Sequence, residues 1–105
     1  MKRQRDHLDI EVLGREVRRL HRVEATWAAL DPEDRVAFRA EWHNVMDVFG
    51  HLVAASEAGR LDDDDTRDLR GLAADLASAL PALERMRLRT PDAGLLARLR
   101  LAAAS

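Results

Sequence analysis

Apolar side chains are arranged symmetrically on either side of a short turn at residues 31–34. Counting backwards and forwards from this turn, they form pairs whose two residue numbers always add up to the same value. The pairs are Trp27 with Phe38, Val23 with Trp42, Leu20 with Val45, and Leu13 with Leu52. Spacings of three, four and seven residues place such side chains on one face of an α-helix. The pattern therefore predicts two long helices that fold back on each other in one register. The apolar face of the first predicted helix consists of Val12, Leu13, Val17, Leu20, Val23, Trp27 and Leu30.

Capping residues and prolines give the ends of the predicted helices. Asp31 and Asp62 are suitable N-caps of the second and third predicted helices, and Pro32 suits the first helical position. Gly59 favours a helix stop, and Pro81 predicts a kink because proline interrupts a helical hydrogen bond. The predicted helices span residues 6–29, 32–58, 62–89 (kinked) and 91–103. The fold class is thus an all-α bundle, built on a long antiparallel hairpin, and we expect a single domain at residues 1–105.

The apolar arc of the second predicted helix is wider than one neighbouring helix can cover. Besides the paired positions, it includes Met46, Val48, Phe49 and Val53. A chain of 105 residues buries a modest core, and helices this long often leave an apolar flank that a second copy covers. We therefore expect a homodimer.

Composition argues against several classes of site and of partner. The formal net charge is −2, so no overall attraction to nucleic acid or to anionic lipid is expected. The absence of cysteine excludes disulfides, thiolate metal sites and cysteine nucleophiles. No apolar run is long enough to span a bilayer, and acidic residues soon follow the basic N-terminus, unlike in a signal peptide. We expect a cytoplasmic protein.

Arginines form a basic stripe on the polar face of the first predicted helix. The stripe consists of Arg15, Arg18, Arg19 and Arg22. Such a ridge can follow a phosphate backbone without reading sequence, although no aromatic side chain is interleaved with it for stacking on bases. One alternative is therefore a nucleic-acid-associated small subunit. The other interpretation is a solvated face whose arginines pair with glutamates.

Two carboxylates and an imidazole lie toward the apolar faces of the paired helices. Glu24 and Glu41 obey the same pairing rule as the apolar residues, and His21 pairs with Asn44 one turn away. Oxygen and nitrogen ligands on facing helices can hold a divalent metal ion. The register thus predicts a candidate metal site of Glu24, Glu41 and His21. Alternatively, both glutamates flank the seam between the helices and pair with arginine.

Two short patterns resemble parts of all-α enzyme families. Residues 44–62 resemble the second metal-binding helix of MazG-type nucleotide pyrophosphohydrolases, which hold magnesium through acidic ExxE and ExxD pairs. Asp47 matches the last acid of that pattern, whereas Asn44 stands where glutamate is expected. The spacing from Arg15 to His21 is similar to the Arg-x-x-x-x-x-His spacing of HEPN-type ribonucleases, which are helical dimers. These resemblances imply, as a further alternative, a metal-dependent all-α hydrolase.

Signatures of nucleophilic catalysis and of glycine-rich phosphate loops are missing from the sequence. Its serines, for example, are not accompanied by a pattern of neighbouring histidine and acid. The architecture is therefore the strongest signal that the sequence carries. The interpretation we favour is a non-enzymatic helical interaction or adaptor module, without a cofactor, that binds a protein partner through an exposed face.

Overall fold

The computed structural model describes the backbone of residues 2–104 and the side chains of residues 5–99. This part of the chain is helical and contains no strand, which confirms the predicted all-α bundle. The elements are α1 (Lys2–Thr26), the 3-10 turn η1 (Trp27–Ala29), α2 (Pro32–Glu57), α3 (Asp63–Ser78), α4 (Leu80–Arg85) and α5 (Ala93–Ala104).

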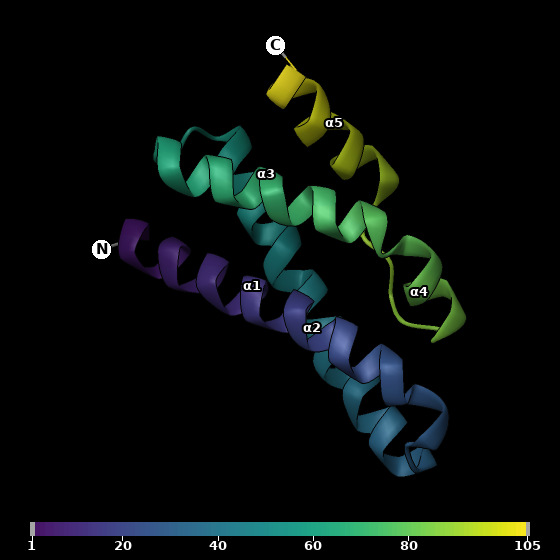
Figure 1. Ribbon diagram of the computed structural model, residues 1–105. Coiled ribbons are helices and arrows are strands. Elements are labelled where there is room, and N and C mark those ends of the chain that lie inside the picture. The colour runs from purple at the N-terminus through teal and green to yellow at the C-terminus, as the bar shows by residue number, and fades with distance from the viewer. Residues whose placement is uncertain (1, 105) are drawn as a thin grey trace.

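The helices form two layers. α1, α3 and α5 lie side by side in that order, and α2 crosses behind them (Figure 1). The molecule is accordingly flat, with extents of 42 × 29 × 17 Å. The core lies between the layers. Its largest fully buried side chains are Trp42, Phe49, Leu13, Leu20, Leu52, Leu69, Leu76, Leu83 and Val53.

The turn of the hairpin brings Trp27 and Phe38 together, as the sequence symmetry predicts. Their ring centroids are 6.0 Å apart in an edge-to-face arrangement, a favourable geometry for an aromatic pair. α1 ends earlier than predicted, at Thr26, and the chain continues as a 3-10 turn. Arg35 closes this turn, because Nε and Nη2 donate hydrogen bonds to the carbonyl oxygens of Trp27 and Ala28 at 3.0 and 2.9 Å. Arg35 thereby supplies hydrogen-bond donors to carbonyl oxygens of the 3-10 turn, and that of Trp27 also accepts from the Leu30 N–H.

The buried face of α1 is rotated relative to the prediction. Val12 was expected on the apolar face but is 42% exposed, whereas Ile10 is buried. The reason is the position of α3, which packs against the side of α1 that carries Ile10 and Gly14. Leu13 and Leu20 remain buried between the layers, so only the edge of the predicted stripe is wrong.

Aspartates occupy the N-caps of α2 and α3, but only the second of them makes a capping hydrogen bond. The Asp62 carboxylate accepts a hydrogen bond from the Asp65 N–H at 2.8 Å, which confirms the predicted cap of α3. Asp31 lies at the N-cap of α2, but its side chain makes no capping hydrogen bond. Pro32 follows it at the first helical position, where the missing N–H costs nothing.

The predicted kinked helix 62–89 is divided into α3 and α4, separated by the single residue Ala79. Pro81 lies two residues further on and has no N–H to donate back to α3, and its ring crowds the preceding turn. The axis of α4 accordingly departs from that of α3 (Figure 1). The prediction was wrong about the end of this segment, because α4 stops at Arg85 and Arg87 adopts a positive φ of 55°.

The segment between α4 and α5 is fastened to α2. Trp42 Nε1 donates a hydrogen bond to the carbonyl oxygen of Arg89 at 2.9 Å, and Arg39 Nε donates to that of Met86 at 3.4 Å. Leu88 between them is buried in the core. These contacts fix the position at which α5 begins beside α3.

Glycine-to-alanine substitutions at the two glycines of the α2 region are expected to have opposite effects on stability. Gly50 lies inside α2, and an added Cβ would meet no atom within 4 Å. Gly50→Ala should therefore raise the free energy of unfolding by about 0.5–1 kcal/mol. Gly59 follows the helix with a φ of +72°, so Gly59→Ala should lower it by about 1–2 kcal/mol. Urea unfolding of both variants measures this difference, and changes of the same sign would contradict the assigned backbone.

Candidate functional site

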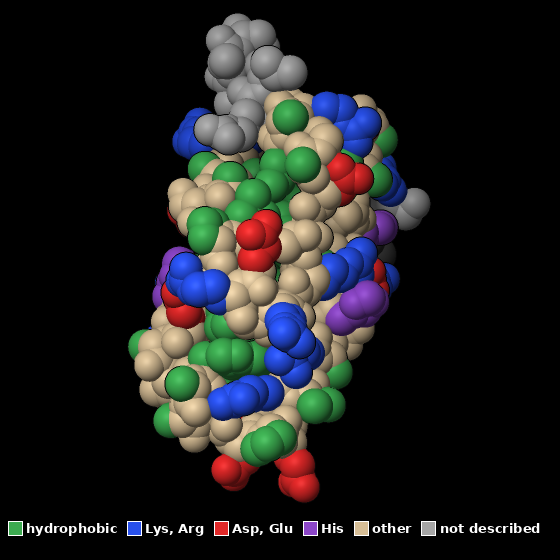
Figure 2. Space-filling view, turned by 90° about the vertical axis from the view of Figure 1, so that its right-hand side faces the viewer, with side chains coloured by type: hydrophobic (Ala, Val, Ile, Leu, Met, Phe, Trp, Pro, Cys, Tyr) green, Lys and Arg blue, Asp and Glu red, His purple; other side chains and the backbone are tan. Residues whose placement is uncertain are grey.

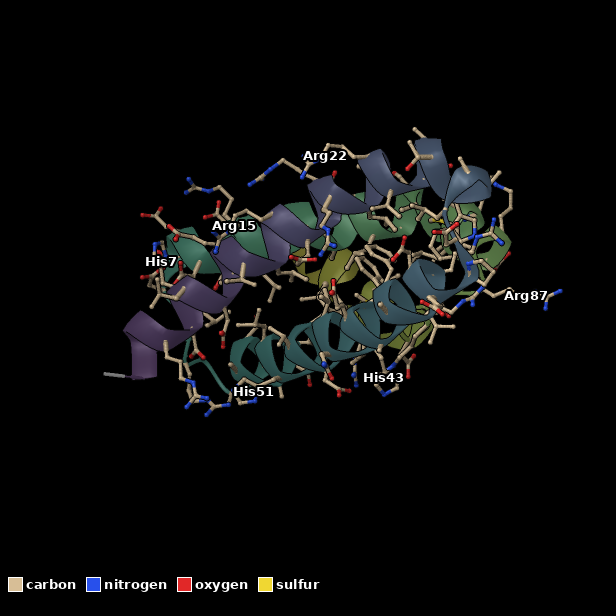
Figure 3. The ribbon with its side chains drawn as sticks, turned by 90° about the horizontal axis from the view of Figure 1, so that it is seen from below. His7, Arg15, Arg22, His43, His51 and Arg87 are labelled. Atoms are coloured by element: carbon tan, nitrogen blue, oxygen red, sulfur yellow. The ribbon has the colours of Figure 1, made fainter. Side chains whose placement is uncertain are left out.

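The arginines of the predicted basic stripe do not form one continuous ridge. Arg19 turns toward α2, where its Nη1 atom donates a hydrogen bond to Glu41 Oε2 at 2.7 Å. Arg15 and Arg22 are exposed on the side of α1 that is turned away from α2 (Figure 3). One of the four positive charges is thus engaged by an acid of the neighbouring helix.

Arg18 and Arg15 line a groove between α1 and α3, with a volume of about 690 Å³. The guanidinium of Arg18 lies 3.5 Å from the position that a Cβ of Gly14 would occupy. Asp68 and Asp75 of α3 also line the groove. A phosphate bound there would meet carboxylates as well as guanidinium groups, so the groove does not favour a polyanion. The face shown in Figure 2 likewise carries basic, acidic and apolar side chains interspersed.

Glu24 and Glu41 were predicted to lie opposite each other, but each pairs with a different arginine. Arg85 Nη2 of α4 donates a hydrogen bond to Glu24 Oε1 at 2.6 Å, and Arg19 holds Glu41. His21 is exposed to solvent. In the described part of the chain, no three His, Asp or Glu side chains are grouped so that they could hold a metal ion. The two glutamates connect α1 to α4 and to α2.

The residues that carry the resemblance to pyrophosphohydrolases lie on the outer side and the edge of α2. Arg89 Nη1 donates a hydrogen bond to Asp47 Oδ1 at 2.6 Å. This hydrogen bond, with the charge of Arg89, holds the pKa of Asp47 below its ordinary value of 3.8. Asn44 borders a different feature, a groove shared with α1. Asp47 is thus bound by a cation of the chain itself.

An apolar groove runs between α1 and α2, on the opposite side of α1 from α3. Its volume is about 450 Å³. It is lined by Val12, Leu13, Glu16, Arg19, Glu41, Asn44, Val45 and Val48. The valines give it apolar walls above the buried Leu13, and the charged residues form its rim. Its lining is more apolar than that of the groove between α1 and α3.

Exposed apolar surface continues from this groove toward the N-terminus of α1. Leu8 is 53% exposed and Val12 is 42% exposed. Since they are four residues apart on a helix, their side chains are neighbours on one face. Val45 and Val48 of α2, both partly buried, lie across the groove from Val12. We call these four residues, Leu8, Val12, Val45 and Val48, the hairpin patch.

Sequence reasoning missed the hairpin patch because it assigned Val12 to the core. The apolar arc of α1 is broad, and a helical wheel does not show which edge of it a third helix covers. The available signal was Leu8, a large apolar residue outside the predicted stripe and one turn before Val12.

A polar contact fixes the part of α1 that carries the hairpin patch. His7 Nδ1 lies 2.8 Å from Oδ1 of Asp65, a buried residue of α3, and His7 Nε2 lies 3.2 Å from Glu11. The hydrogen bond to Asp65 and the charge of that carboxylate raise the pKa of His7 above its ordinary value of 6.5, and Glu11 adds to the effect. The contact therefore joins α1 to α3 most strongly when His7 is protonated.

The stability of the fold is expected to decrease as the pH rises through the folded-state pKa of His7. Because this pKa is raised on folding, the contribution of His7 is fully present below its unfolded value and is lost above its folded value. His7→Gln should remove this part of the pH dependence. Urea unfolding of both proteins between about pH 6 and pH 8.5 measures it. Identical slopes for the two proteins would mean that the contact with Asp65 does not form.

Known proteins offer no guide to this site. No family model, no curated protein and no solved structure matches the chain. In the described residues, no helix combines the length and the apolar composition that crossing a membrane requires.

Proposed function

We propose that the protein is a non-enzymatic helical interaction module that binds an apolar helical surface of a protein partner in the groove between α1 and α2. The observation that carries this proposal is the hairpin patch. Leu8 and Val12 expose large apolar side chains beside a groove whose walls are also apolar. Single exposed apolar residues are ordinary, but a contiguous group with a polar rim is typical of a protein-binding surface.

The groove has the chemistry of a helix-binding site. Its floor and walls are aliphatic, so a partner helix with an apolar stripe can bury that stripe there. Glu16, Arg19 and Glu41 at the rim carry charges of both signs. Rim charges of this kind contribute mainly to the orientation and the choice of the partner, whereas the apolar contacts supply most of the affinity.

The helices that form the groove are held in place before any partner arrives. Arg19 bridges α1 and α2 at the rim, and its guanidinium lies 5.4 Å from the centre of the Phe38 ring. Glu24 ties α1 to α4 through Arg85. A preformed groove loses little conformational entropy on binding, which favours affinity.

A nucleic-acid partner is supported less well by the same geometry. Such a partner needs a continuous row of cations that are free to contact phosphates. Arg19 is engaged by Glu41, and Arg18 shares its groove with Asp68 and Asp75. We therefore keep the protein partner as the proposed one.

The proposal is tested by adding one charge to the hairpin patch and one elsewhere. Val12→Asp places a carboxylate in the groove, and Val36→Asp is the matched control because Val36 is 62% exposed on α2 outside the groove lining. In extracts of the source cells, concentrated until the chain exceeds about 50 μM, the wild type and Val36→Asp should elute as complexes larger than the 11.8 kDa chain. Val12→Asp should elute as the free chain. Co-elution of Val12→Asp with the wild type would contradict the proposal.

A further inference from the structure

The occupant that best fits the groove is a second copy of this chain. We propose that the protein forms a twofold-symmetric dimer in which the two α1 helices pack antiparallel across the hairpin patch, with Arg5 of each chain against the partner's Glu16. This inference rests on the proposed function, because it names the occupant of the same groove.

The charges next to the hairpin patch lie in a self-complementary order along α1. Arg5 is exposed and precedes Leu8 by three residues, and Glu16 follows Val12 by four. At about 100° per residue, Arg5, Leu8, Val12 and Glu16 fall within about 80° of the helix circumference. Between residues 5 and 16, this face of α1 thus reads, in chain order, cation, apolar, apolar, anion. Arg19 follows on the same face, but its charge is engaged by Glu41 of its own chain.

An antiparallel twofold arrangement pairs these residues favourably. In such a helix pair, opposing residue numbers add up to a nearly constant value, so Leu8 meets the partner's Val12 and Arg5 meets the partner's Glu16. The twofold axis lies in the plane of the interface and is perpendicular to both helices. Rotation about it therefore keeps a residue and its equivalent in the partner on the same lateral side of the helix pair. Glu16 lines the apolar groove. Arg5 lines a second groove between α1 and α2, whose lining also includes Asp9 and Asp47, so both charges are turned toward the α2 side of α1. The two opposite charges therefore come together twice, once at each end of the patch.

A parallel arrangement of the same two helices would be unfavourable. It would place Arg5 against the partner's Arg5 and Glu16 against the partner's Glu16, and like charges in an interface discriminate against that pairing. The chain thus selects one orientation for its own copy. A partner with an unrelated sequence would match this order of charges only by coincidence.

The groove receives the apolar part of the second helix. With α1 of the partner laid along it, the partner's Leu8 and the partner's Val12 contact Val12, Val45 and Val48. Four apolar positions per chain make a small interface, at the low end of the range for stable complexes. We therefore expect a concentration-dependent dimer with a Kd on the order of 10 μM.

Charge reversal tests both the dimer and its orientation in purified protein. Arg5→Glu should weaken dimerisation at least about tenfold, because two glutamates then oppose each other at each end. Glu16→Arg should do the same with two arginines. An equimolar mixture of the two variants should restore a dimer within about threefold of the wild-type Kd, since every opposing pair is again of opposite sign. Sedimentation equilibrium gives the Kd of the wild type, of each variant and of the mixture, and circular dichroism checks that both variants fold.

The mixture separates an interface effect from an effect within one chain. Glu16 also lies 3.6 Å from Arg19 in its own chain, and loss of that contact would not be repaired by adding a different molecule. A wild-type protein that remains an 11.8 kDa monomer at about 200 μM would overturn the dimer. Unaffected variants, or a mixture that stays monomeric, would overturn the antiparallel pairing. If the purified protein is monomeric but its complex in extracts still depends on Val12, this inference fails and the proposed function stands.

Discussion

Replacing Trp42 with alanine is expected to lower the free energy of unfolding by about 3–5 kcal/mol. Trp42 is buried and stacks on Phe38, with ring centroids 6.3 Å apart. Its Nε1 atom also donates the hydrogen bond to the Arg89 carbonyl that fastens the α4–α5 segment to α2. Small domains are stable by about 5–15 kcal/mol in total, so this variant should be close to unfolding at room temperature.

A matched variant separates the two roles of this tryptophan. Trp42→Phe keeps an aromatic ring in the core but removes the hydrogen-bond donor, so it should cost less, about 1–3 kcal/mol. Urea unfolding gives these values, and the circular dichroism signal of the helices reports the transition in all three proteins. A loss below about 1 kcal/mol for Trp42→Ala would mean that α2 does not pack as described.

Leucine-to-alanine substitutions at two positions of α1 are expected to affect different properties. Leu20→Ala should lower the stability of the fold, whereas Leu8→Ala should weaken the dimer. Leu20 is fully buried between the layers, and Leu20→Ala should cost about 2–5 kcal/mol. Leu8 is more than half exposed, so Leu8→Ala should change the stability of the monomer by less than about 0.5 kcal/mol. Both values should be measured at low protein concentration, because dimerisation would otherwise add to the apparent stability.

Leu8→Ala should instead weaken the dimer, by about tenfold, because Leu8 supplies apolar contact area only in the interface. Sedimentation equilibrium of Leu8→Ala against the wild type measures this change. If Leu8→Ala unfolded as easily as Leu20→Ala, Leu8 would belong to the core and the hairpin patch would not be a docking surface.

The sequence predicts those parts of the fold that depend on local chemistry and on the pairing of two consecutive helices. The contact of Trp27 with Phe38 at the turn follows from the symmetric spacing. The cap of α3 by Asp62 follows from the preference of aspartate for a position where its carboxylate meets free N–H groups. Both are settled within a few residues of a turn, where few alternative arrangements exist.

Features that depend on a third helix were not predictable in this way. Whether Ile10 or Val12 becomes the buried edge of α1 is decided by α3, whose position a helical wheel of α1 does not contain. In the same way, Glu24 was expected near Glu41 but accepts a hydrogen bond from Arg85, which belongs to α4 and is distant in the sequence. The candidate docking surface consists of residues that this packing leaves uncovered. It therefore becomes visible only when the third helix is in place.

The most direct test of the central claim, that the groove between α1 and α2 is a protein-binding surface, is site-specific photo-crosslinking in the source cells. A benzophenone-containing amino acid is introduced in place of Val12 in one protein and in place of Val36 in the control. The proposed function predicts a crosslinked adduct at position 12 and none at position 36. The proposed dimer predicts further that this adduct has twice the mass of the chain. An adduct with a different protein would leave the function standing without the dimer. Absence of an adduct at position 12, or equal adducts at both positions, would contradict the central claim.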